Sequence, residues 1–196
     1  MSIVAKASDK EFEKFPLPDE GTVQAVCAGV WDLGMQPTNY NGVEKLQHKV
    51  VIALELNQMI DSPESDYHNM PYMLSKTYTL SLYENANLRR DLESWRGRPF
   101  TDEQVKQGFD VETLYGINCL VGVSHVTKND RTFANITSIL PLMKGAEKIQ
   151  PVRGKDDEPP NWVKEKQAGA VVEETDEETP FDEAGPDIGD GEDIPW

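Results

Sequence analysis

The alternation of apolar and other residues along the chain, interrupted once by a segment of helical period, constrains the fold most strongly. Five stretches have the pattern of β-strands, and the second is the clearest because its larger apolar residues occupy every other position. The predicted strands cover residues 22–31, 45–56, 72–83, 117–127 and 131–140. A chain with this pattern is expected to form a sheet with one buried face.

The segment between the third and fourth predicted strands has a different period. Apolar residues between positions 86 and 95 recur at helical spacing, with Asn85 or Asn87 available as the N-cap and Gly97 predicted to end the helix. A second helix is predicted to start at Thr101, where the sequence has a capping pattern. A short turn is expected at residues 110–115.

The order of three strands, a helical segment and two further strands predicts a mainly β fold. It is typical of a five-stranded OB-fold barrel with a helical insert between strands 3 and 4. Residues 32–42 are rich in turn-forming types and are predicted to be a loop, and Asn129-Asp130 indicates a tight hairpin. We expect this domain to cover residues 21–150, after an N-terminal arm of residues 1–20.

The acidic charge is concentrated in the last part of the chain. Residues 156–196 contain 15 Asp and Glu against 2 Lys, whereas residues 1–155 contain 20 acidic and 17 basic residues. The charge and low hydrophobicity of residues 151–196 predict a disordered acidic tail. Because that tail is a separate segment, the formal net charge of −16 does not exclude a basic groove for nucleic acid on the domain. The tail is expected to compete for this groove when DNA is absent.

Catalysis, metal binding and membrane insertion find little support in the sequence. Cys27 and Cys119 lack the spacing of a zinc site and are expected to be buried free thiols, and His48, His68 and His125 have no metal-ligand spacing. The motifs of phosphate loops, dinucleotide folds and nucleophile elbows are absent, so we expect no catalytic residue, metal or cofactor. Without an apolar run or a signal-peptide core, a cytoplasmic protein with no membrane partner is expected, in the host cell if the protein is viral.

Single-stranded nucleic acid is held by positive charge along its backbone and by aromatic rings on which its bases stack. In an OB-fold the second and third strands and the adjoining loops form the binding surface. Basic and aromatic residues alternate in these parts of the sequence. The candidates for DNA binding are Trp31, Tyr40, Lys45, Lys49, Tyr72, Lys76, Lys128, Arg131 and Phe133.

Most of these candidates have an alternative role in the fold. Trp31 and Phe133 fit a core position as well as a stacking position. Lys76 shares a strand face with apolar residues, so either that face binds DNA or the lysine extends from the edge of the core. Lys45 and Lys49 fit a solvated strand face as well as a binding face. The arginines between positions 89 and 98 fit contacts to phosphate or to the acidic tail, and equally salt bridges along a helix.

The chain ends in an acidic pair followed by Ile, Pro and a terminal aromatic residue. These residues are Glu192, Asp193, Ile194, Pro195 and Trp196. This ending resembles the acidic tip of bacterial and phage single-stranded DNA-binding proteins, which typically reads Asp-Asp-Ile-Pro-Phe. The resemblance implies an OB domain that coats exposed strands and a tip that docks replication and repair proteins, whose pocket offers basic groups to the carboxylates and an apolar slot to the aromatic ring.

The strand pattern and this resemblance together predict a phage-type or plasmid-type single-stranded DNA-binding protein, with the phage type favoured. Its expected function is non-catalytic, largely sequence-independent binding and protection of single-stranded DNA during replication, recombination or repair. The helical insert departs from the bacterial domain, which favours a monomer or dimer over the bacterial tetramer. Two alternatives stay open: an OB-like adaptor whose groove binds protein instead of DNA, and a small nuclease or recombination enzyme.

Overall fold

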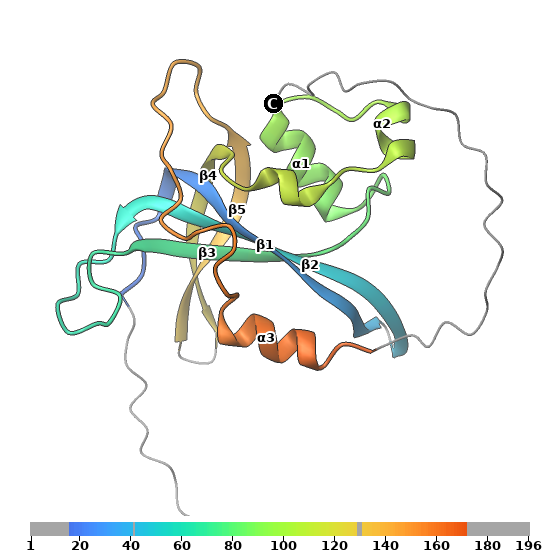
Figure 1. Cartoon of the computed structure of the whole chain (residues 1–196), viewed down its shortest axis with the longest axis horizontal. Coiled ribbons are helices and arrows are strands. Elements are labelled where there is room, and N and C mark those ends of the chain that lie inside the picture. Colours follow the sequence, from blue (N-terminus) through green and yellow to red (C-terminus); the bar gives the residue numbers. More distant parts are fainter. Residues whose placement is uncertain (1–15, 41, 129–130, 172–196) are drawn as a thin grey trace, which may run out of the picture.

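A computed structural model of the chain describes residues 16–40, 42–128 and 131–171 (Figure 1). The predicted mainly β architecture with five strands is confirmed. The elements in chain order are β1 (Gly21–Tyr40), β2 (Val43–Met59), β3 (Pro71–Thr79), α1 (Asn87–Arg96), α2 (Asp102–Gln107), the 3-10 helix η1 (Val111–Leu114), β4 (Asn118–Lys128), β5 (Arg131–Pro141) and α3 (Asn161–Ala168).

The strands form one antiparallel sheet in the order β3-β2-β1-β4-β5. The first residues of β1, Gly21 to Val26, pair with β4, and β1 from Ala25 onward pairs with β2. Register shifts after Cys27 and Asp32 bend β1, so the β1–β2 hairpin extends away from β4 and β5 (Figure 1). In the described chain no ladder joins the edge strands β3 and β5, so the sheet is open where the pattern predicted a barrel.

The strand β1 is longer than predicted, because residues 32–40 continue it instead of forming a loop. Pro37 pairs with Leu46 and Asn39 pairs with Glu44 on β2. This part of β1 lies beyond the residues that pair with β4, and a proline is tolerated on such an edge because its missing N–H leaves no ladder bond unmade there. Cross-strand pairing therefore outweighs the local turn preference of these residues.

The inner face of the sheet packs against α1 to form the main core. Leu88, Leu92 and Trp95 of α1 are buried, and the Trp95 indole Nε1 donates a hydrogen bond of 3.1 Å to the backbone oxygen of Asn118 on β4. Each fully buried side chain of this size contributes about 1.5–3 kcal/mol relative to an exposed one. The helical period of this segment therefore positions one apolar stripe against the sheet.

The ends of the helices match part of the sequence analysis. Gly97 ends α1 in the left-handed conformation with φ 68°, as predicted, and the capping box at Thr101 is present. The N-cap prediction was wrong, because the N-cap residue of α1 is Ala86, which has no side chain to cap the helix, and not Asn85 or Asn87.

The outer face of β1 and β2 is covered by α3, in a region assigned above to a disordered tail (Figure 1). Val163 is 0% exposed and packs with Leu33 and Val51, flanked by Trp31 and Trp162. The prediction of disorder was therefore wrong for residues 151–171. The apolar island in this segment is too short to form a core by itself, and it folds because the sheet offers it an apolar surface. The remainder of the predicted tail lies outside the described residues.

Hydrogen bonds to the sheet fix the path of the chain around α3. The Gln167 side-chain nitrogen donates to the Asp32 backbone oxygen at 2.7 Å, and the Val171 backbone nitrogen donates to the Met35 oxygen at 2.9 Å. At the other end of the domain, the Glu20 carboxylate accepts a hydrogen bond from the His125 backbone nitrogen. The folded unit therefore includes residues from both the predicted arm and the predicted tail.

The two thiols are buried and free, as expected. Burial raises the pKa of Cys27 to about 12, so this thiol stays protonated at neutral pH. Among the described helices, none is both long enough and apolar enough to cross a membrane.

Replacing Val163 by Asp should release α3 from the sheet, because a carboxylate cannot remain unpaired in this apolar site. We expect faster amide hydrogen exchange in residues 161–171, while exchange in the core strands changes little. Lys166→Asp, at an exposed position on the same helix, is the matched control and should leave exchange unchanged. Equal exchange in the two variants would contradict the packing described here.

Candidate single-stranded DNA interface

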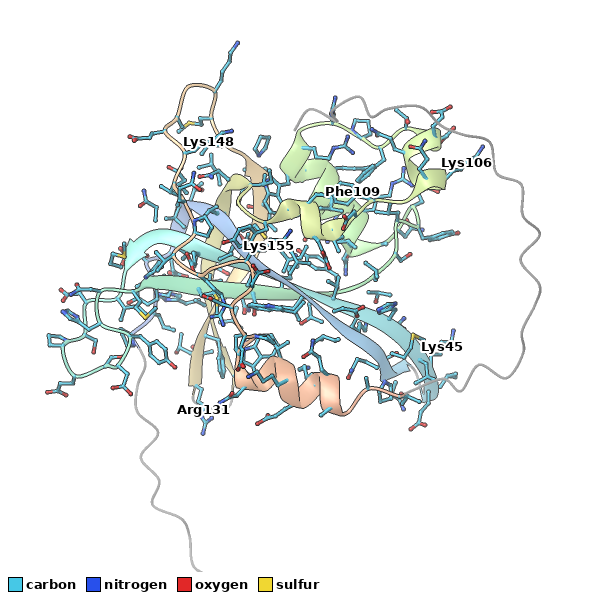
Figure 2. The ribbon with its side chains drawn as sticks, viewed as in Figure 1. Lys45, Lys106, Phe109, Arg131, Lys148 and Lys155 are labelled. Carbon is cyan, nitrogen blue, oxygen red and sulfur yellow. The ribbon has the colours of Figure 1, made fainter. Side chains whose placement is uncertain are left out.

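Four of the nine predicted DNA-binding residues are exposed at the ends of the two hairpins. Lys45 lies near the end of the β1–β2 hairpin, and Lys128 pairs with Arg131 at the end of the β4–β5 hairpin. Figure 2 shows Lys45 and Arg131 on the same side of the molecule, with α3 between them in this view. Phe133, 48% exposed, lies two residues from Arg131 and pairs across the ladder with the exposed Val126.

Tyr40 ends β1 opposite Val43, and the position of its side chain lies outside the described part of the structure. The residues of the predicted docking tip, Glu192 to Trp196, also lie outside the described residues. Their roles therefore stay predictions from the sequence.

Trp31 occupies a packing position. Its indole ring lies over Gly29, where a Cβ atom would come within 2.4 Å of the ring, and α3 packs against it in the outer cluster. The Arg153 guanidinium lies 5.6 Å from the ring centroid. The sequence allowed a packing role or a base-stacking role for Trp31, and the structure favours packing. The helix α3 and the segment that precedes it limit access to the ring.

Tyr72 and Lys76 of β3 face the inner side of the sheet. Tyr72 packs against the main core, and its pKa is raised by burial and by the negative charges of Asp19 and Asp61. An acidic setting of this kind disfavours a phosphate. The structure thus gives no support to Tyr72 as a DNA-stacking residue.

Lys76 is held by α1 instead of facing solvent. Its ammonium lies 2.5 Å from the Asp91 carboxylate, which also accepts a hydrogen bond of 2.9 Å from the Tyr78 hydroxyl. Burial and the adjacent Asp91 charge raise the pKa of Tyr78, so the hydroxyl remains a donor. The structure favours the alternative in which Lys76 extends from the edge of the core. We therefore do not include Lys76 in the candidate interface.

Lys49 lies on the outer face of β2 and points toward β3. Its ammonium donates hydrogen bonds to the Gln47 side-chain oxygen at 2.6 Å and to the Thr79 hydroxyl at 2.8 Å. Burial lowers the pKa of Lys49. Both partners are neutral, so its charge is not compensated by them. An open cleft of about 370 Å³ begins beside this lysine and runs to the start of α1.

The residues that complete this cleft were not predicted from the sequence. Tyr83 and the two asparagines Asn85 and Asn87 line it, together with hydroxyl groups of β3. Tyr83 was assigned to the end of a strand, whereas β3 ends at Thr79 and Tyr83 lies in the connection to α1. The sequence did contain a signal for these residues: an aromatic residue, Tyr83, close to two asparagines just after a strand.

The arginines of α1 are engaged with their neighbours. Arg89 donates to Glu93 at 2.9 Å, Arg90 lies 3.6 Å from Asp91, and the Arg96 guanidinium stacks over the ring of Phe100. These contacts match the salt-bridged helix face that was one of the two alternatives. They leave the hairpins and the Lys49 cleft as the better site for an anionic chain.

Comparison with known proteins does not assign the chain to a family. No protein-family model matches it, and no curated protein sequence is similar enough to count as a relative. Within the described residues, no group of three or more His, Cys, Asp or Glu side chains is arranged to hold a metal ion.

Replacing Lys76 by Met should lower the free energy of unfolding by about 1–3 kcal/mol, because the largely buried Asp91 carboxylate loses a charged partner. Lys45→Met, at an exposed position, should change it by less than about 0.5 kcal/mol. Urea denaturation followed by circular dichroism measures both values. Equal stability of the two variants would contradict a structural role for Lys76.

Proposed function

We propose that the chain binds single-stranded DNA without catalysis and with little sequence preference, and that its C-terminal tip docks replication or repair proteins. The observation that carries the proposal is the placement of exposed cations and an aromatic ring at the two hairpin ends beside the outer face of β2 and β3. These are the β1–β2 and β4–β5 loops and the strand face with which OB-folds bind oligonucleotides.

The strand connectivity supports this comparison with the OB-fold. An OB-fold is a five-stranded, partly open barrel. Here β1 pairs with both β2 and β4, β5 follows β4, and the edge strands β3 and β5 approach within 8 Å between Cα atoms without pairing. The helix α1 fills the space at the inner side of the sheet. We propose that the domain is an open member of this fold class.

The proposed interface is smaller than the set predicted from sequence. It includes Lys45 and Lys49 on β2 and Lys128, Arg131 and Phe133 on the β4–β5 hairpin. The cations neutralise phosphate charges, and Phe133 offers a face to a base. Because α3 covers the centre of the outer face, the DNA follows the parts of the sheet that α3 leaves exposed.

Titration of a fluorescent oligo-dT at two salt concentrations tests this function. We expect binding at low salt that weakens as salt rises, because the affinity comes largely from neutralised phosphates. Absence of binding at low salt would contradict the proposal and favour the adaptor alternative, in which the same surface binds protein.

Replacing Lys45 and Lys128 together by Ala should reduce the slope of log affinity against log salt by about 1.4, since each contact to a single strand contributes about 0.7. Lys106→Ala with Lys148→Ala is the matched control, because these lysines lie at the opposite end of the molecule (Figure 2). A slope that changes equally in both double variants would place the interface elsewhere.

Removing residues 172–196 should tighten DNA binding at low salt, because this segment carries 11 Asp and Glu and no Lys or Arg. The truncation must begin after residue 171, since α3 covers apolar residues of the sheet. Removing only residues 194–196 should leave DNA affinity nearly unchanged and abolish capture of the partner protein. An unchanged affinity after removal of residues 172–196 would argue against competition by the tail.

A further inference from the structure

The cleft beside Lys49 has the chemical character of a site for an anionic, hydrogen-bonding ligand. It lies between the outer face of β2 and β3 and the connection from β3 to α1. Lys49 is the single charged residue among the described residues that line it, and no described carboxylate lines it. Its volume of about 370 Å³ is within the range of small-molecule sites in proteins.

The position of the Lys49 ammonium is fixed by its neighbours. Two of its three N–H donors are used by Gln47 and Thr79, and the third is left for a ligand. The Thr79 hydroxyl also lies 3.2 Å from the Gln47 side-chain oxygen, so the three side chains form one network on the wall of the cleft. Thr77, two residues before Thr79, adds a hydroxyl on the same strand face. This wall suits a phosphate group.

Tyr83 forms the other side of the cleft and is 73% exposed. Its backbone is held in a turn: the Tyr83 nitrogen donates to the Ser81 hydroxyl at 3.2 Å, and the Ala86 nitrogen donates to the Tyr83 oxygen at 2.8 Å. A large aromatic ring that is exposed to solvent on a backbone held in a turn is suited to stacking on a base, a contact that contributes about 1–3 kcal/mol.

We propose that this cleft is a nucleotide subsite of the DNA interface, in which Lys49 and the Thr77 hydroxyl hold one phosphate and Tyr83 stacks on the adjoining base. The inference rests on the proposed function and extends it to residues outside the hairpins. The side-chain amides of Asn85 and Asn87 lie at the edge of the base. Since an amide both donates and accepts hydrogen bonds, these contacts fit any of the four bases.

Two variants and two probes separate the phosphate contact from the stacking contact. The variants are Lys49→Gln and Tyr83→Ala, with Lys106→Gln and Tyr67→Ala as controls that remove an exposed cation and an exposed tyrosine elsewhere. The probes are oligo-dT and an abasic oligonucleotide of equal length, which keeps the phosphates and lacks the bases. Titration uses the full chain, and thermal unfolding checks that each variant remains folded. Tyr83→Phe keeps the ring and should bind like the unchanged protein.

Tyr83→Ala should weaken binding of oligo-dT by about fivefold to a hundredfold and leave binding of the abasic probe unchanged. Lys49→Gln should weaken binding of both probes and reduce the salt slope by about 0.7. If the unchanged protein binds oligo-dT and both variants bind it as their controls do, the subsite is refuted and the proposed function stands. If the unchanged protein does not bind oligo-dT, the function itself fails. If Lys49→Gln weakens binding of a peptide of residues 187–196 and not of the oligonucleotides, the cleft is a site for acidic peptide and the inference is wrong.

Discussion

The buried carboxylate of Glu55 determines which part of the outer face of the sheet is covered by α3 and which part stays exposed. Glu55 is 6% exposed, and its two oxygens accept hydrogen bonds from the backbone nitrogens of Val152 and Arg153 at 2.6 and 3.0 Å. Hydrogen bonds to an ionised group are stronger than neutral ones. They hold the connection after β5 across β2, and this path brings α3 onto Leu33 and Val51. Together with the packing of Val163, this anchor keeps the apolar centre of the outer face covered.

This division determines which cations of the sheet would be accessible to DNA in the proposed function. With α3 on the centre of the outer face and Lys76 paired with Asp91, the accessible cations of the described strands are those at the two hairpin ends and Lys49 beside β3. Arg89 and Arg90 of α1 are paired with its acidic residues and Arg96 stacks over Phe100, so the inner side offers less available charge. The proposed interface therefore does not include Trp31 or Lys76, because the fold itself uses both side chains. The Trp31 ring packs beside α3, and the Lys76 ammonium pairs with Asp91.

The sequence predicted the parts of the fold that depend on local pattern. Alternation identified β2, and Gly97 and Thr101 marked helix ends, because strand period and capping are local properties. The extension of β1 through Pro37 depended on its pairing with β2, and the order of α3 depended on contacts with Val51, far away in sequence. Neither was predictable from neighbouring residues. The strand parity of Lys76 was visible in the sequence, but its partner on α1 was not.

Amide hydrogen exchange with and without saturating oligo-dT tests most directly where the interface lies. Binding on the exposed part of the outer face should slow exchange in residues 43–49, 77–87 and 126–134, which line the hairpin ends and the Lys49 cleft. Exchange in α2 and η1, on the opposite side of the molecule from α3 (Figure 1), should not change. Slower exchange confined to α1, α2 and η1 would contradict an interface on the outer face of the sheet.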